Sequence, residues 1–186
     1  SDHYAFLDWD GACVLWMGMD QRDGAGDPQD ASTHGNDGTA MGEAAATTAG
    51  RFGDAFTFDG DGDVIALGNE PDFAFTPETD FTISTWVYNR DGTDEAGILT
   101  KRDNASRYMP TYQKTGHWQF EMKDQSGTIA YIGAAETEPT DRWVHLAGVY
   151  DSAAQEMRLY VDGAPAATGG TAGLGDFTSD EPLEIG

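Results

Sequence analysis

Hydrophobic and polar residues alternate one by one along much of this chain. The clearest runs are 81–88 (FTISTWVY), 143–151 (WVHLAGVYD) and 157–161 (MRLYV). An alternation of period two is typical of β-strands that bury one face. Residues 152–156 and the pair Asp162-Gly163 supply turn residues after the last two runs, since glycine accepts a positive φ without steric cost. We therefore expect antiparallel strands joined by tight turns.

Shorter apolar runs at 55–58, 64–67, 97–99, 118–122 and 129–132 are separated by Gly, Asp or Pro. Short strands at this spacing predict an all-β sandwich or barrel, and no helical stripe of useful length interrupts them. Residues 20–48 are rich in Gly, Asp, Ser, Thr and Ala, so we expect a long ordered loop there, with a possible turn at 42–49. The alternation predicts these core residues: Phe58, Phe81, Ile83, Trp86, Trp143, Val149, Leu159 and Val161. Trp86 is out of phase with Phe81 and Ile83, which indicates either a β-bulge or a side chain on the opposite face.

Four segments together resemble the LamG-like domains of the concanavalin A-like lectin/glucanase superfamily. They are 143–163, 52–64, 81–87 and 30–39, where Thr33 replaces a usual glycine. The resemblance implies a two-sheet antiparallel jelly-roll sandwich, with Trp86, Trp143 and Tyr150 in its core. The family continues beyond P-L-x-I-G, here 182–186, into a further strand pair. We therefore expect residues 1–186 to be a single domain, excised from a larger protein and lacking those last strands.

The chain is strongly acidic, with 33 Asp plus Glu against 10 Lys plus Arg and a net charge of −23. Such a field repels nucleic acid, anionic membranes and acidic glycans. Two interpretations stay open: a solvated surface suited to high salt, as in a halophilic or marine protein, or a cation-binding surface. The single cysteine, Cys13, excludes an intrachain disulfide. Without 18 consecutive apolar residues we expect no direct membrane insertion, and without Lys or Arg in the first ten residues no intact signal peptide.

Each catalytic motif that the superfamily or other hydrolases would suggest is missing. The glucanase pattern E-x-D-x-x-E, the lyase clusters, G-x-S-x-G and zinc-binding histidine spacings do not occur. His145 alternates with Val144 and Leu146 inside a strand, which favours a structural role. We therefore expect no enzymatic activity.

Calcium binding is a hypothesis for the acidic loops, because calcium takes carboxylate and carbonyl oxygens from irregular backbone. LamG-like relatives commonly hold a structural calcium at the N-terminal loop. The resemblance implies Asp20 and Asp30 as metal ligands, and Asn36 in the same loop is a further candidate ligand. The alternative is that these loops are only solvated.

Sugar binding needs exposed aromatic rings beside hydrogen-bonding groups, and residues 101–131 mix both. The predicted ligand-binding residues are Arg102, Asn104, Arg107, Tyr108, Tyr112, Trp118 and Tyr131. We expect a non-catalytic recognition or adhesion module, extracellular or at the cell surface, that binds carbohydrate. A cell-surface protein as ligand, a polysaccharide lyase or glycoside hydrolase with an unrecognised site, and a structural spacer are the alternatives.

Overall fold

The computed structural model describes residues 11–68, 71–90, 96–102, 107–114, 116–135 and 140–186, with the backbone alone at 102 and 107–114. The chain divides into two compact units, Ser1–Phe73 and Ala74–Gly186, which we treat separately. Among the described residues the regular elements are β-strands and one 3-10 turn, η1 (Pro71–Phe73). The prediction of an all-β protein is confirmed. Whether both units form the single domain predicted over 1–186 stays a prediction.

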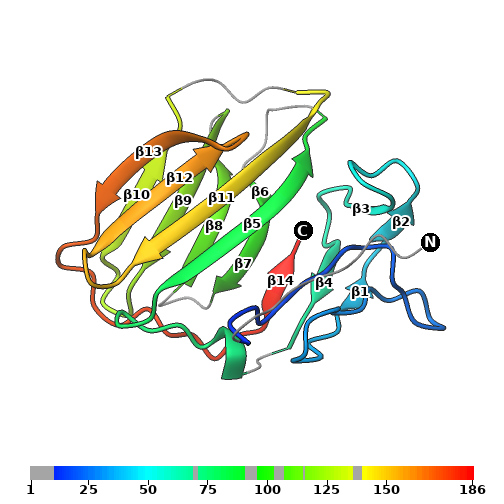
Figure 1. The fold of residues 1–186 in the computed structure, drawn as a ribbon, viewed down its shortest axis with the longest axis horizontal. Helices are drawn as coiled ribbons and strands as arrows, with labels where there is room; N and C mark the ends of the chain where they lie inside the picture. The colour runs from blue at the N-terminus through cyan, green and yellow to red at the C-terminus, as the bar shows by residue number, and fades with distance from the viewer. Residues whose placement is uncertain (1–10, 69–70, 91–95, 103–106, 115, 136–139) are drawn as a thin grey trace. The chain divides into compact units, whose positions relative to one another are not determined.

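The second unit contains a four-stranded antiparallel sheet in the order β13-β12-β11-β5 (Figure 1). Its strands are β5 (Phe81–Tyr88), β11 (Trp143–Asp151), β12 (Glu156–Val161) and β13 (Ala164–Gly170). Between β12 and β13, Asp162 has φ 51° and Gly163 has φ 79°. Two consecutive positive φ angles define a type I′ turn, so the hairpin signal of Asp162-Gly163 is confirmed.

A second antiparallel sheet of the same unit has the order β14-β7-β8-β9-β10, and β6 also pairs with β8. Its strands are β6 (Ala96–Gly97), β7 (Leu99–Arg102), β8 (Arg107–Lys114), β9 (His117–Lys123), β10 (Ile129–Gly133) and β14 (Leu183–Ile185). The two sheets form the two layers of a sandwich (Figure 1).

Residues that alternate along the strands fill the space between these sheets. Val144 and Leu146 of β11 are fully buried, as is Phe120 of β9. The Phe81 ring lies 6.2 Å from the Phe120 ring and 5.5 Å from the Tyr150 ring, between centroids. The strand alternation therefore places one face of each sheet in a common apolar core, as a jelly-roll sandwich requires.

The predicted core is correct for Phe81 and Leu159, which are buried, whereas Trp86 is 37% exposed. The other predicted core residues are half-buried: Phe58, Ile83, Trp143, Val149 and Val161. Trp86 is an odd number of positions from Phe81, so on a regular strand its side chain points to the opposite face. The expectation that Trp86 fills the core is wrong, and the one for Tyr150, 3% exposed, is confirmed.

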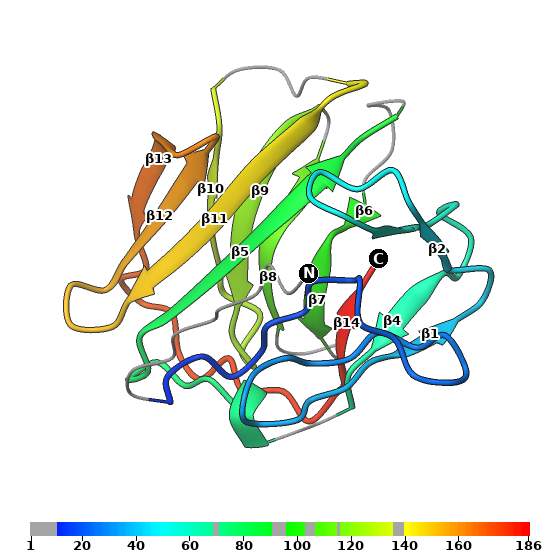
Figure 2. The same cartoon turned by 45° about the vertical axis from the view of Figure 1, so that its right-hand side comes forward.

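The first unit holds two short antiparallel pairs. β1 (Thr39–Met41) pairs with β4 (Val64–Ala66), and the two run side by side (Figure 2). β2 (Ala45–Thr47) pairs with β3 (Ala55–Thr57). The expectation of a long loop over 20–48 is therefore wrong at β1 and β2, whereas the turn expected within 42–49 is present at Gly42 and Glu43 and ends before β2 begins. Long-range partners impose these strands on residues whose own composition favours turns.

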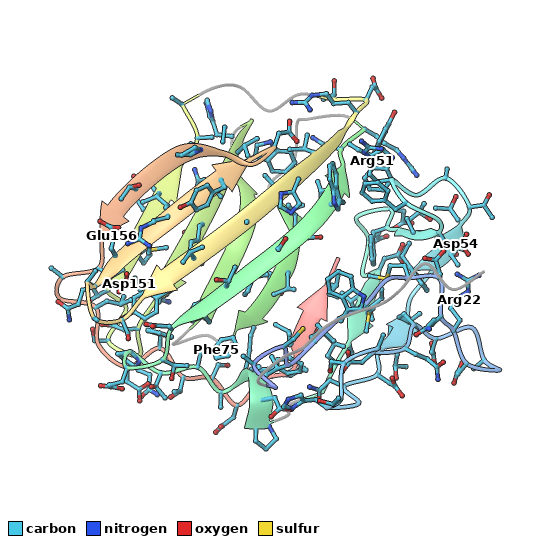
Figure 3. All side chains as sticks on the ribbon, viewed as in Figure 1. Arg22, Arg51, Asp54, Phe75, Asp151 and Glu156 are labelled. Carbon is cyan, nitrogen blue, oxygen red and sulfur yellow. The ribbon has the colours of Figure 1, made fainter. Side chains whose placement is uncertain are left out.

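Contacts between distant residues hold the rest of this unit together. Arg22 and Asp54 form an ion pair at 2.8 Å (Figure 3). The imidazole of His34 lies 2.6 Å from the Asp72 carboxylate, and this hydrogen bond raises the pKa of His34.

Among the described residues of both units, no helix has the length and hydrophobicity that a membrane span requires.

Candidate functional site

The outer face of the four-stranded sheet carries exposed aromatic rings. Trp86 and Tyr88 of β5 point away from the core and are 37% and 42% exposed. Their cross-strand partners on β11 are His145 and Trp143. The Tyr88 and Trp143 rings lie 5.5 Å apart in an edge-to-face arrangement, and those of Trp86 and His145 lie 5.2 Å apart. Because cross-strand partners share a face, these four side chains form two neighbouring rows.

A third row follows on the same face. Ser84 of β5 pairs with Ala147 of β11, and Ala147 pairs with Tyr160 of β12. The Tyr160 side chain is half-buried, and Ser84 is exposed. These three rows form the aromatic ladder, whose rings belong to Trp86, Tyr88, Trp143, His145 and Tyr160.

Hydrogen bonds fix the middle of the aromatic ladder. The Oγ of Ser84 lies 2.8 Å from Nε2 of His145, with the donor set by the imidazole tautomer. The Asp162 carboxylate accepts a bond from the backbone N–H of His145 at 3.0 Å and one from Arg142 at 2.8 Å. These two bonds, the one from His145 first, lower the pKa of Asp162. The I′ turn therefore positions the strand that carries two rings of the ladder.

Two arginines that flank this face, Arg142 and Arg158, are held by carboxylates. Arg142 pairs with Asp162 at 2.8 Å. Arg158 of β12 pairs with Glu156 at 2.6 Å and with Asp151 at 3.1 Å, at the opposite end of the hairpin (Figure 3). These guanidinium groups are already neutralised, so they offer little attraction to an anionic ligand.

The structure separates the predicted ligand-binding residues into three groups. Trp118 is 2% exposed and alternates with Phe120 and Met122 on the inner face of β9, so its interpretation as a surface residue is wrong. Tyr131 of β10 is 64% exposed, and its role in binding stays a prediction. The remaining residues have no described side chains: Arg102 on β7, Arg107, Tyr108 and Tyr112 on β8, and Asn104, which lies outside the described residues.

Sequence reasoning missed the aromatic ladder because it assigned Trp86 and Trp143 to the core. A usable signal was present. Trp86 and Tyr88 share one alternation phase of 81–88, and Phe81 and Ile83 occupy the other. A strand has only two faces, so the first pair had to leave the core that the second pair enters.

The predicted metal ligands bind protein donors. Asp30 accepts hydrogen bonds from the backbone N–H groups of Trp16, Ser32 and Asn36 and from the Ser32 hydroxyl, at 2.6–2.9 Å. Although burial alone would raise it, the net effect of these bonds is to lower the pKa of Asp30. Asp20 accepts a bond from the backbone N–H of Asp54 at 2.7 Å.

The amide of Asn36 donates to the carbonyl of Val14 at 2.8 Å and to the carboxylate of Asp72 at 3.2 Å. Within the part of the chain that the structure describes, no three His, Cys, Asp or Glu side chains group closely enough to hold a metal ion. Calcium binding by Asp20, Asp30 and Asn36 stays a prediction.

Solved structures of similar fold include several binding domains. The binding domain of Paraclostridial Mosquitocidal Protein 1 is 18% identical, with a TM-score of 0.79 over 92% of this chain and 43% of that one. The binding domain of botulinum neurotoxin serotype G is 14% identical, with a TM-score of 0.70 over 92% and 42%. This chain therefore spans less than half the length of these toxin domains.

A third similar structure is domain 4 of AbnA, a GH43 extracellular arabinanase from Geobacillus stearothermophilus, in complex with arabinotriose. It is 18% identical, with a TM-score of 0.61 over 84% of this chain and 76% of that one. At these identities the likeness establishes the fold. Comparison with curated proteins finds no match.

A family model described as the concanavalin A-like lectin/glucanases superfamily, of laminin G type, matches residues 59–186. The match covers the whole sandwich of the second unit, including all three rows of the aromatic ladder. The strand motifs, the two-sheet sandwich and this match together show that the chain belongs to the concanavalin A-like lectin/glucanases superfamily.

Proposed function

We propose that this chain is a non-catalytic, extracellular carbohydrate-binding module that holds a neutral glycan on the aromatic ladder. The observation that carries the proposal is the exposure of Trp86 and Tyr88, at 37% and 42%, on a regular sheet face. Large aromatic side chains contribute much of the energy of binding sites when a ligand covers them. The C–H faces of sugar rings stack on such rings, and hydroxyls reach polar neighbours such as Ser84.

Charge favours a neutral ligand. The chain has a net charge of −23, which opposes the approach of uronate or sulfated glycans. Arg142 and Arg158 are each paired with carboxylates beside the ladder. An acidic sugar that approached Arg142 or Arg158 would have to compete with their carboxylate partners.

The similar structures support a binding role. Two of them are binding domains of toxins, and one is a domain of an extracellular arabinanase in complex with arabinotriose. A recognition module outside the cell accords with these names. The superfamily also includes glucanases, so any test of binding has to measure turnover as well.

The test is isothermal titration of the purified chain with neutral gluco-, xylo-, manno- and arabino-oligosaccharides of up to six units. We expect Trp86→Ala to weaken binding about tenfold or more, because it removes an exposed stacking surface. The matched control is Phe52→Ala, which removes an exposed ring of the first unit and should leave affinity unchanged. Tyr131→Ala tests the other predicted binding surface, because it removes an exposed ring from the other sheet.

Each outcome of this titration has a defined meaning. Loss of binding in Tyr131→Ala with none in Trp86→Ala would move the site to the sheet that contains β10. Release of new reducing ends during the titration would show an enzyme instead of a binding module. If no glycan of the panel binds the unaltered chain, the carbohydrate proposal is wrong.

A further inference from the structure

The three rows of the aromatic ladder follow one another along the strands, so the ladder is longer in that direction than a single sugar. Resting on the proposed function, we infer that it binds a linear neutral glycan lengthwise over the strands, along β5 and β11 and onto the Tyr160 ring of β12. We also infer that it recognises the interior of the glycan chain instead of its end.

The spacing of the rows determines how many linked sugars the ladder can contact. Tyr88 with Trp143, Trp86 with His145, and Ser84 with Ala147 and Tyr160 follow one another at every second residue. Residues two apart on a strand are separated by about 6.7 Å, so the three rows extend over roughly 13 Å. One sugar ring is similar in size to a phenol ring and covers about one row. Contact with all three rows therefore requires several linked sugars.

The row beyond the ladder determines whether a bound glycan can continue past the third row. Past Ser84 and Ala147, the outer face continues with Thr82 opposite Val149. Thr82 is exposed and Val149 is half-buried. Arg158 of β12 is the third residue of this row, opposite Val149, and its guanidinium is held by Glu156 and Asp151. On β5 and β11, neither Thr82 nor Val149 is large enough to form a wall across the face. A glycan that lies on the three rows can therefore continue past this end of the ladder.

The paired charged groups beside the ladder indicate that no pocket for a chain end is formed by them. Recognition of a chain end commonly needs a dedicated polar pocket that closes around the terminal sugar. The charged groups beside the ladder bind one another instead: Asp162 holds Arg142, and Glu156 and Asp151 hold Arg158. The face thus carries aromatic rings and the Ser84 hydroxyl along its middle, and Arg142 and Arg158 at its sides are paired with carboxylates, which suits an uncharged chain that passes over it.

The experiment is a chain-length series, from one to six units, of whichever neutral oligosaccharide of the panel binds tightest. We expect the monosaccharide to bind at least about a hundredfold more weakly than the tetrasaccharide, with affinity rising through three or four units and then levelling. A hexasaccharide whose reducing end has been opened with borohydride should bind as tightly as the intact one. Equal affinity for one and six units, or loss of binding on reduction, would overturn the inference and leave the proposed function intact.

Two variants at opposite ends of the ladder test the direction. Tyr88→Ala removes a ring of the first row, and Tyr160→Ala removes the ring of the third row. Both should weaken hexasaccharide binding about tenfold, with circular dichroism unchanged from the unaltered chain. Phe52→Ala, which removes an exposed ring of the first unit, is the control. If Tyr160→Ala binds the hexasaccharide normally, the glycan does not lie along the strands. If no oligosaccharide binds at all, both proposals fail.

Discussion

Asp124 illustrates what a single carboxylate does in this fold. Its oxygens accept hydrogen bonds from the backbone N–H groups of Ser126, Thr128 and Gly175 and from the Ser126 hydroxyl, at 2.7–2.9 Å. These bonds, the one from the Ser126 hydroxyl first, lower the pKa of Asp124 to about 2. One side chain thereby joins the β9–β10 turn to the segment that precedes β14.

We predict that Asp124→Asn lowers the melting temperature at neutral pH and that the difference narrows in acid. A carboxyl whose folded pKa lies below its unfolded value of 3.8 stabilises the fold above pH 3.8, and this stabilisation is lost as the pH falls toward 2. Thermal melts of both proteins between pH 3 and 7 measure the difference, with the exposed residue Asp61, changed to Asn, as control. A difference independent of pH would show that the lost carboxylate charge is not the cause.

Asp30 allows the calcium hypothesis to be separated from hydrogen bonding. Because Asp30 accepts four hydrogen bonds, we predict that Asp30→Ala loosens residues 30–37 even in the presence of a chelator. Limited proteolysis with calcium and with chelator, on the variant and the unaltered chain, measures this. If the variant differs from the unaltered chain only when calcium is present, and chelation alone loosens the loop, a calcium site is the correct explanation.

At the scale of the element, the I′ turn between β12 and β13 links backbone conformation to the candidate site. Gly163 has φ 79°, and a Cβ at this position would meet no atom within 4 Å. The cost of a side chain there is therefore backbone strain alone. The neighbouring Asp162 holds Arg142 and the backbone of His145, so strain in the turn reaches the aromatic ladder.

We predict that Gly163→Ala destabilises the chain by about 1–2 kcal/mol, the usual cost of a left-handed conformation for a residue with a Cβ. This corresponds to a fall in melting temperature of roughly 2–8 °C. Gly24→Ala is the matched control, because Gly24 also has open space around it but no left-handed φ. Equal melting temperatures for Gly163→Ala and the unaltered chain would mean that the turn changes type at no cost.

At the scale of the whole molecule, the net charge of −23 makes repulsion between carboxylates the main electrostatic contribution to stability. Exposed carboxylates repel one another, and salt screens that repulsion over a distance of about 10 Å at 0.1 M. The few ion pairs, such as that between Arg22 and Asp54, offset only a small part of it.

We predict that the melting temperature rises when sodium chloride increases from 0.05 to 1 M, since screening lowers the free energy of the compact state. Differential scanning calorimetry measures the rise, with potassium chloride as a check that the effect is not specific to one cation. A melting temperature that stays constant or falls with salt would contradict the interpretation of the acidic surface as one suited to high salt.

The alternation along the chain determined the all-β class, the position of β5 and β11, and the turn at Asp162-Gly163. These features follow from local rules: side chains alternate between two faces, and glycine tolerates a positive φ. The sequence pattern did not predict the strands β8, β13 and β14. β8 contains Pro110, β13 is built from small residues, and β14 has three residues, so none shows a strong local pattern.

The sequence pattern separates Trp86 and Tyr88 from Phe81 and Ile83, but only the tertiary structure decided which of the two strand faces is accessible. The sequence placed Trp118 at the surface and Trp86 in the core, and the fold reverses both. The identity of the buried face depends on which side the second sheet covers, and that is set by pairing between strands far apart in the chain. For the same reason, the rows that join Tyr88 to Trp143 and Ala147 to Tyr160 exist only once β5, β11 and β12 are aligned in register.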